Sequence, residues 1–239
     1  MGKPVGFEVK DWVAPPRPQD APMEGRYARL ERINAEAHSG DLFKANSEDT
    51  SEGIWDYLPY GPYHAQATYH KWLRDMAQKG DPFFYAIKNK ELGRFCGVAS
   101  YLRIDPDAGS IEVGHINFAP ALQRTRAATE AMYLMMKWAF EAGYRRYEWK
   151  CDALNAGSRR AAQRLGFSYE GVFRQATMYK GRNRDTAWFA AIDKEWPALE
   201  AAFQAWLDPS NFTPEGRQID SLGNLTALVR VASDPTLEP

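Results

Sequence analysis

The segment at residues 118–130, FAPALQRTRAATE, has the residue types of a phosphate-binding turn. We predict that it runs from the end of a strand into the start of a helix, where backbone N–H groups lack intrahelical partners and the helix dipole is positive. Phosphate groups bind at such helix N-termini. The predicted donors here are Gln123, Arg124, Thr125 and Arg126, and the small residues that let a ligand approach are Ala127 and Ala128. The segment therefore predicts an anion-binding site.

The charge distribution also favours an anionic ligand at this segment. The 239-residue chain carries 30 Lys and Arg against 31 Asp and Glu, whereas residues 123–184 carry 13 basic and 5 acidic side chains. A near-neutral chain offers no general attraction for nucleic acid or a membrane surface, so neither is an expected partner. Alternatively, basic residues such as Arg160 and Arg164 form a solvated helix face. The two cysteines and four scattered histidines have no metal-ligand spacing, so no metal is expected.

Apolar periodicity places this turn inside a mixed α/β sheet. A strand is predicted at residues 110–118, a helix with apolar residues at i, i+3, i+4 and i+7 at residues 125–142, and a strand at residues 147–151. Such a unit forms a right-handed parallel crossover. Other strands are predicted at residues 25–33, 82–88, 95–104, 169–176 and 186–192, and other helices at residues 34–46, 64–78, 157–165 and 194–207. We expect a mostly antiparallel sheet of about seven strands with helices on both faces.

The composition divides the chain into an arm, a domain and a tail. Residues 1–22 are rich in proline and predict an extended N-terminal arm. Residues 23–208 hold the predicted strands and long helices and form one domain. Residues 209–239 are mostly polar around a short apolar patch and predict a docked tail. Because the N-terminus lacks the apolar region of an export signal and no apolar run is long enough to span a membrane, we expect a cytoplasmic protein.

Several motifs together resemble the GNAT family of acyl-CoA-dependent N-acyltransferases. Residues 123–128 (QRTRAA) are similar to the family's pyrophosphate loop, Gln/Arg-x-x-Gly-x-Gly/Ala. Residues 155–167 (NAGSRRAAQRLGF) are similar to its Asn-x-x-Ser and Leu-Gly-Phe signature. Residues 112–115 (EVGH) and the hairpin region 170–185 resemble the ribosomal-protein (RimJ/RimL-like) N-acetyltransferase branch. The order and spacing of the motifs, over residues 24–196, are more specific than any motif alone.

The resemblance implies acetyl-CoA as cosubstrate and the residues that bind it. These cofactor-binding residues are Phe118, Gln123, Arg124, Thr125, Arg126, Ala127, Ala128, Thr129, Asn155, Ser158 and Arg159. Arg126 departs from the family pattern, in which glycine is usual at this position. Its side chain either crowds the pyrophosphate or points outward and adds a phosphate contact. Crowding would favour our alternative to an enzyme, a non-catalytic GNAT-like domain that binds CoA or a partner.

The implied reaction requires an amine to lose a proton before it attacks the thioester, because amine pKa values lie above neutral pH. Glu112 is our candidate base; alternatively, it forms a structural ion pair with an arginine such as Arg103. Ser158 is our candidate acid for the thiolate leaving group; alternatively, it only hydrogen-bonds the cofactor or the helix start. His115, three residues after Glu112, is more typical of a satisfied core histidine.

We expect the acceptor to be a primary amine that attacks acetyl-CoA directly in a ternary complex. It is either a protein N-terminus or a small amine metabolite or antibiotic. Aromatic side chains with polar tips suit a partly wet acceptor pocket, and they gather in the loop at residues 54–63. The predicted substrate-binding residues are Trp55, Tyr57, Tyr60 and Tyr179; alternatively, the loop aromatics pack the N-terminal helices onto the sheet. The oligomeric state stays open, with a homodimer as one alternative.

Overall fold

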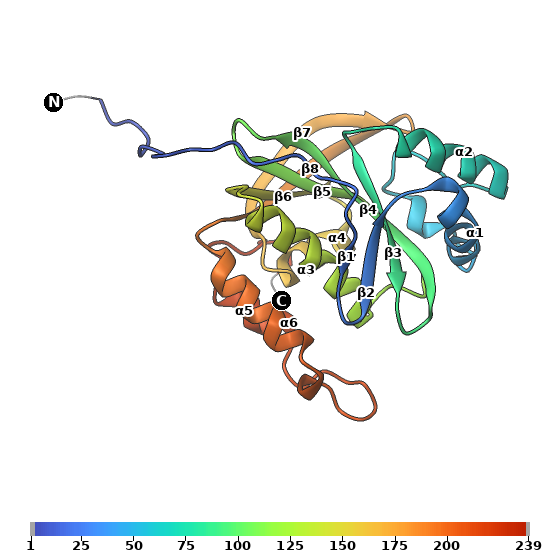
Figure 1. Cartoon of the computed structure of the whole chain (residues 1–239). Coiled ribbons are helices and arrows are strands. Elements are labelled where there is room, and N and C mark those ends of the chain that lie inside the picture. The colour runs from blue at the N-terminus through green and yellow to red at the C-terminus, as the bar shows by residue number, and fades with distance from the viewer. Residues whose placement is uncertain (1–2, 238–239) are drawn as a thin grey trace.

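The computed structural model describes residues 3–237, and its centre is one eight-stranded sheet (Figure 1). The strands are β1 (Met23–Glu24), β2 (Ala28–Arg32), β3 (Phe83–Asn89), β4 (Arg94–Asp105), β5 (Ser110–Phe118), β6 (Arg146–Asp152), β7 (Ser168–Tyr179) and β8 (Arg182–Ile192). They lie in the order β1–β2–β3–β4–β5–β6–β8–β7. β5 and β6 pair in parallel and the other neighbours pair antiparallel. The predicted mixed sheet is confirmed, and the short β1 is the strand beyond the expected seven.

Helices cover both faces of the sheet, as predicted. They are α1 (Ala35–Asn46), α2 (Gln66–Ala77), α3 (Arg126–Glu141), α4 (Ala156–Arg164), α5 (Trp196–Leu207) and α6 (Leu222–Ala227), with single 3₁₀ turns η1 (Gly53–Trp55) and η2 (Pro209–Asn211). In Figure 1, α1 and α2 lie on one side of β2–β4, and α3, α5 and α6 lie on the other.

Strand β3 shows how one sheet serves two hydrophobic cores. Its side chains alternate between the faces because the side-chain period of a strand is two. Tyr85 and Ile87 belong to the core cluster under α3, whereas Phe84 and Ala86 belong to the cluster under α1 and α2. The strand is therefore apolar almost throughout instead of alternating with polar residues.

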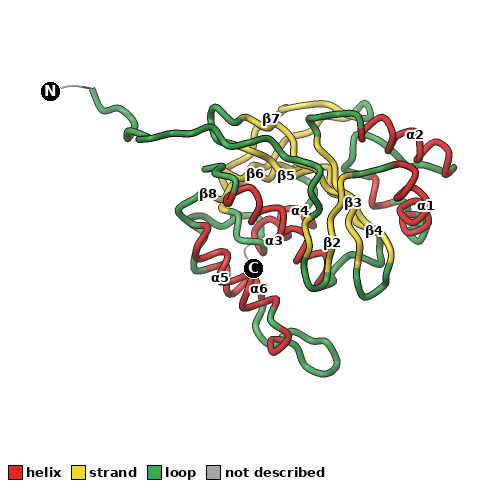
Figure 2. The backbone as a smooth tube through the Cα atoms, viewed as in Figure 1, coloured by secondary structure: helices red, strands yellow, loops and turns green. Residues whose placement is uncertain are grey.

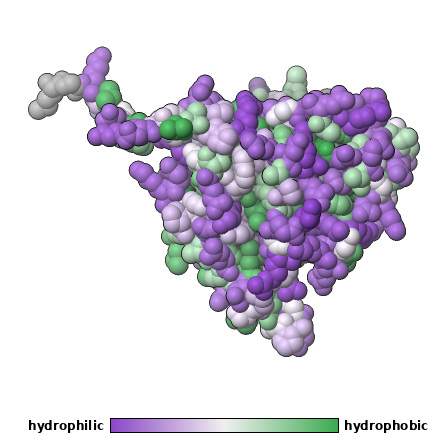
Figure 3. All heavy atoms as spheres, viewed as in Figure 1, coloured by the Kyte–Doolittle hydropathy of each residue, from purple (hydrophilic) through white to green (hydrophobic). Residues whose placement is uncertain are grey.

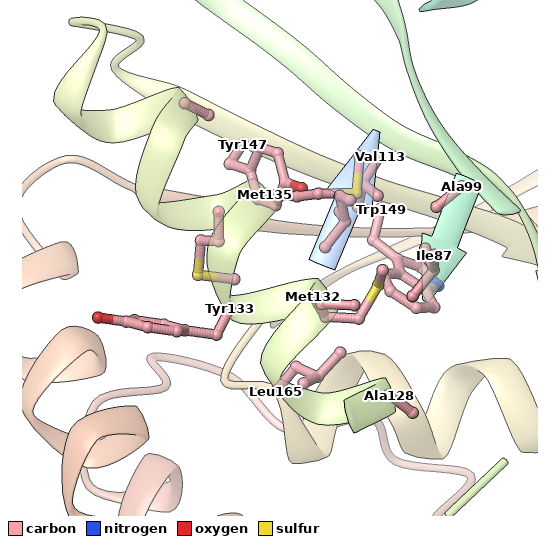
Figure 4. Close-up of a cluster of buried hydrophobic side chains, with 14 of the residues drawn as sticks. Ile87, Ala99, Val113, Ala128, Met132, Tyr133, Met135, Tyr147, Trp149 and Leu165 are labelled. Carbon is pink, nitrogen blue, oxygen red and sulfur yellow. The ribbon is translucent and has the colours of Figure 1, made fainter. Parts of the chain in front are cut away.

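Helix α3 is held against the sheet by the apolar stripe that the sequence predicted. Ala131, Met132 and Met135 are all buried within the cluster. In Figure 4 the side chains of Met132 and Met135 point from α3 toward those of Val113 and Trp149 on the strands beneath. This packing sets the position of the α3 N-terminus relative to β5 and β6.

Strands β5 and β6 separate beyond their fourth residue pair, and this separation creates the space for a site. Their parallel pairing runs from Ser110 opposite Arg146 to Val113 opposite Trp149. Past that point the register of β5 with β4 shifts, and His115 adopts a positive φ of 50°. A bulge of this kind bends a strand away from its neighbour. Beyond this point β5 remains paired with β4, and β6 remains paired with β8.

The two ends of the chain lie over the domain as loops and short helices (Figure 2). The hydroxyl groups of Tyr85 and Tyr144 donate to the carbonyls of Gln19 and Pro16, which ties the second half of the arm down. Its first residues extend away from the body, past a face on which hydrophilic side chains predominate (Figure 3). In residues 3–237, no helix has the length and apolarity needed to cross a membrane.

Candidate active site

A cavity of about 1390 Å³ opens where β5 and β6 separate. Its walls come from the strand ends, the first turns of α3 and α4, the β7–β8 hairpin, η1 and part of the C-terminal tail. The cavity therefore brings together motifs that lie far apart in the sequence. Within the described part of the chain, no cluster of side chains has the composition of a metal site.

The N-terminus of α3 forms one side of this cavity. Thr125 caps the helix, because its hydroxyl accepts from the Ala128 N–H at 3.1 Å. The Gln123 amide donates to the Phe118 carbonyl at 2.8 Å and so closes the turn from β5. Arg124 takes a positive φ of 59°, which directs the chain into the helix. Phe118, Gln123, Arg124, Thr125, Arg126, Ala128 and Thr129 all line the cavity, whereas the Ala127 side chain lies in the core.

Four guanidinium groups surround this helix start, and carboxylates do not neutralise them. They belong to Arg124, Arg126, Arg160 and Arg164, which all line the cavity. No carboxylate of residues 3–237 lies within 4.0 Å of them, although Arg103, Arg146 and Arg159 have such partners. Together with the orphan N–H groups of the helix, these cations suit phosphate groups.

Arg126 is held by aromatic rings. Its guanidinium carbon lies 4.8 Å from the ring centroid of Tyr27 and 4.9 Å from that of Phe212. Arg164 makes a similar contact with Trp206, at 4.9 Å. Cation–π contacts stabilise a guanidinium without removing its charge. The side chain that replaces the family's glycine therefore packs beside Tyr27 and Phe212 at the edge of the cavity.

The N-terminus of α4 forms a second side. Asn155 caps this helix, because its side-chain oxygen accepts from the Ser158 N–H at 3.0 Å. The Ser158 hydroxyl accepts from the indole N–H of Trp149, also at 3.0 Å. Both residues line the cavity. Two helix N-termini thus open into the same space.

Arg159 is the predicted cofactor residue that the structure places elsewhere. Its guanidinium forms two hydrogen bonds with the carboxylate of Asp234, at 2.6 and 2.7 Å, and a third with the Ala153 carbonyl. It is buried and does not line the cavity, so the structure lends no support to the predicted contact with the cofactor. Its neighbour Arg160 and the next-turn Arg164 line the cavity instead. Their i, i+4 spacing was the available signal for a shared helix face.

Glu112 lies at the centre of a buried ion-pair network. It is 3% exposed, accepts from Arg103 at 2.7 Å and lies 2.8 Å from the Lys150 ammonium. Burial raises the pKa of the Glu112 carboxyl above its ordinary value despite these two cations. The ion pair that the sequence analysis gave as an alternative is therefore present, and the carboxylate still lines the cavity.

His115 lies at the bulge of β5, beside the splayed strands. Its ring stacks on that of Tyr60, with centroids 5.6 Å apart. Burial, assisted by the charges of Arg103 and Arg184, lowers the pKa of His115 to about 4. The imidazole is neutral at neutral pH.

The aromatic loop divides between the core and the cavity. Trp55 is buried in the α1–α2 cluster, and Tyr60 packs against that cluster with its hydroxyl buried. Neither side chain lines the cavity, and both pack the first helices onto the sheet, which is the alternative given for the loop aromatics. Tyr57 and Tyr179 do line it. The Tyr179 hydroxyl donates to Asp152 at 3.0 Å, and burial followed by this carboxylate raises the pKa of Tyr179 to about 12.

Comparisons with known proteins agree with this geometry. The sequence model of the acetyltransferase (GNAT) domain matches residues 29–168. A GCN5-related N-acetyltransferase from Brucella melitensis is 44% identical, with a TM-score of 0.89 over 92% of this chain and 100% of that one. A probable GNAT acetyltransferase from Chromobacterium violaceum is 40% identical, with a TM-score of 0.76 over 82% and 98% of the two chains. The chain therefore belongs to the GNAT family of N-acetyltransferases.

More distant relatives share the fold. The acetyltransferase from Salmonella typhimurium that modifies the N-terminal serine of ribosomal protein L7/L12 is 21% identical, with a TM-score of 0.62 over 72% of this chain and 99% of that one. RimL has also been solved in complex with coenzyme A. No curated protein matched the chain. The family transfers acetyl groups from acetyl-CoA.

Proposed function

We propose that this protein transfers an acetyl group from acetyl-CoA to a primary amine, by direct attack in a ternary complex. The observation that carries the proposal is the cavity between β5 and β6, into which two helix N-termini and four unneutralised guanidinium groups open. Acetyl-CoA supplies an activated thioester. The phosphate end of this cosubstrate lies at α3 and α4, and its acetyl end lies toward Glu112 and Ser158.

The cavity residues divide into three roles. The turn from Phe118 to Thr129 binds the phosphates through backbone N–H groups and the Arg124 and Arg126 side chains. Asn155 holds the start of α4 and offers its polar groups to the pantetheine arm. Glu112 takes the proton of the amine, directly or through water, because it is a carboxylate on the cavity wall.

Ser158 supports departure of the thiolate from the other side of the cavity. Its hydroxyl accepts from Trp149, which leaves the hydroxyl proton available for donation. Tyr57 and Tyr179 contact the acceptor.

The acceptor is either a protein N-terminus or a small amine. The ribosomal-protein branch, the cytoplasmic location and a homodimer are further predictions.

The non-catalytic alternative rested on Arg126. The contacts of its guanidinium with Tyr27 and Phe212 support the outward placement of this side chain, which is the placement expected of an enzyme. We therefore retain the enzyme as the proposed function.

Calorimetric titration with acetyl-CoA tests the cosubstrate half of the proposal. We expect micromolar binding that Arg124→Ala weakens about tenfold, because a charge-assisted hydrogen bond is lost. Arg174→Ala is the matched control, since Arg174 is exposed on β7 and does not line the cavity. A folded protein that fails to bind acetyl-CoA, or equal weakening by both substitutions, would contradict the proposal.

Release of the CoA thiol in the presence of amines tests the catalytic half. Glu112→Gln should leave acetyl-CoA binding intact and lower kcat by about 10²–10⁴, as expected for loss of a general base. If Glu112 serves only the ion-pair network, the variant retains kcat, which would contradict its role as the base. Thermal unfolding of the same samples shows that the variant is folded at the assay temperature.

A further inference from the structure

Two hydrogen-bond donors without partners belong to one part of the cavity wall. This part, which we call the amine side, is formed by Glu112, His115, Tyr179, Arg184 and Trp188. The Nε atom of Arg184 is buried and has no hydrogen-bond partner among residues 3–237. The indole nitrogen of Trp188 is also buried and also has no hydrogen-bond partner among these residues. A buried donor without a partner is costly, and more so when it is charged. The side chain of Arg184, which lines the cavity, thus lacks part of the hydrogen bonding that a guanidinium requires.

The charge of Arg184 is also unneutralised. No carboxylate in the described chain lies within 4.0 Å of it, and its guanidinium carbon lies 5.6 Å from the centroid of the Tyr179 ring. Two other arginines of the sheet have such partners: Arg103 of β4 pairs with Glu112, and Arg146 of β6 pairs with both Glu148 and Glu170. Arg184 lines the cavity without a carboxylate partner among residues 3–237.

Arg184 belongs to a different part of the cavity from the phosphate-binding cations. It lies on β8, where it pairs with Thr177 of β7. Two residues further along β8, Thr186 pairs with Asp152 of β6. Its charge acts on His115 at the β5 bulge, together with that of Arg103. Arg184 therefore lies on the His115 side of the cavity, where the proposed function places the acceptor amine.

We propose that Arg184 binds a carboxylate of the acceptor, so that the substrate is a primary amine that also carries a carboxylate. This inference rests on the proposed acetyl transfer. The planar guanidinium matches a carboxylate with paired hydrogen bonds. Two sources have this chemistry: a free amino acid, and a peptide N-terminus with an acidic side chain close to the amine.

Matched acceptor pairs test the inference. One arm compares free amino acids with their carboxamides, and the other compares N-terminal peptides containing Asp or Glu with the same peptides containing Asn or Gln. CoA thiol release gives kcat and KM for each. We expect a carboxylate preference of about 10- to 100-fold in kcat/KM, mainly through KM, in one arm. The arm with the preference identifies the source of the carboxylate.

Substitution at Arg184 then links the preference to this residue. Arg184→Gln should abolish the preference, and Arg184→Lys should retain part of it. Arg182→Gln is the matched control, because Arg182 is exposed on the same strand and does not line the cavity. Acetyl-CoA binding and thermal unfolding show that each variant is folded.

Three results would overturn the inference. In the first, carboxylates and their neutral counterparts are acetylated equally well. In the second, the preference survives in Arg184→Gln. In the third, acetyl-CoA binds but no member of either arm is acetylated, which leaves the cosubstrate half of the proposed function standing. Failure to bind acetyl-CoA would instead remove the proposed function itself.

Discussion

At the scale of single residues, burial shifts the pKa values of titratable groups that line the cavity. His115 is neutral because burial and two nearby arginines disfavour its charged form. Cys151 also lines the cavity, and burial raises the pKa of its thiol to about 11, so it is a poor nucleophile at neutral pH. Glu112 remains the group best suited to accept a proton. The chemistry thus depends on burial as much as on residue type.

The depressed pKa of His115 predicts a pH dependence of stability. Between pH 6.5 and pH 4 the unfolded chain binds a proton at this residue and the folded chain does not, so the free energy of unfolding falls as the pH falls. Urea denaturation should show a loss of about 2 kcal/mol from this source between pH 7 and pH 5. The variant His115→Gln should lack this contribution. Equal pH dependence in both proteins would show that His115 does not titrate as described.

At the scale of secondary structure, two helices have the same cap but different surroundings. Asn34 accepts from the Ala37 N–H at the start of α1, and Asn155 accepts from the Ser158 N–H at the start of α4, both at 3.0 Å. The α4 cap opens into the cavity, whereas Asn34 does not line it. A comparison of Asn34 with Asn155 therefore distinguishes the effect of a cap on stability from its effect on ligand binding.

Alanine substitutions at these two caps should have equal effects on stability and different effects on binding. Asn34→Ala and Asn155→Ala should each lower the free energy of unfolding by about 1 kcal/mol. Asn155→Ala should also weaken acetyl-CoA binding about tenfold, since the α4 N-terminus loses its position. Denaturation and calorimetry measure the two effects. Unchanged affinity in Asn155→Ala would remove this residue from the cofactor site.

At the scale of the whole molecule, the C-terminal tail is part of the site's support. Asp234, fully buried, pairs with Arg159 of α4, and the hydroxyl of Thr226 donates to the Arg164 carbonyl at the other end of the same helix. Phe212 and Gln218 of the tail line the cavity. The tail thus contacts both α4, through Arg159, and the start of α3, through Arg126.

Breaking the tail contact should destabilise the whole domain. Asp234→Ala leaves a buried guanidinium without its partner, which costs about 3–5 kcal/mol. Chemical denaturation of the full chain measures the loss. Glu215→Ala is the control, because Glu215 is exposed in the same tail and forms no ion pair within the described residues. A small effect of Asp234→Ala would mean that the tail is not coupled to the stability of the domain.

Much of the fold was predictable because its signals are local. The apolar stripe of α3, the alternation and β-branched content of the strands, and the crossover from β5 to β6 all follow from backbone geometry and near neighbours. The strand-to-helix turn at residues 118–126 was predictable for the same reason, since its strand end and its cap are close in sequence.

Other features depend on partners distant in sequence. Arg159 and Arg160 are adjacent and chemically identical, and the pairing of Arg159 with Asp234, 75 residues later, decides which of them reaches the cavity. Trp55 and Tyr57 are likewise close in sequence, but the docking of α1 and α2 buries one and exposes the other to the site. The sequence by itself determined the elements, the family and the strand-to-helix turn at the start of α3. The tertiary structure alone decided which side chains face the cavity and which cations lack a counter-charge, because burial and ion pairing arise from contacts between distant segments.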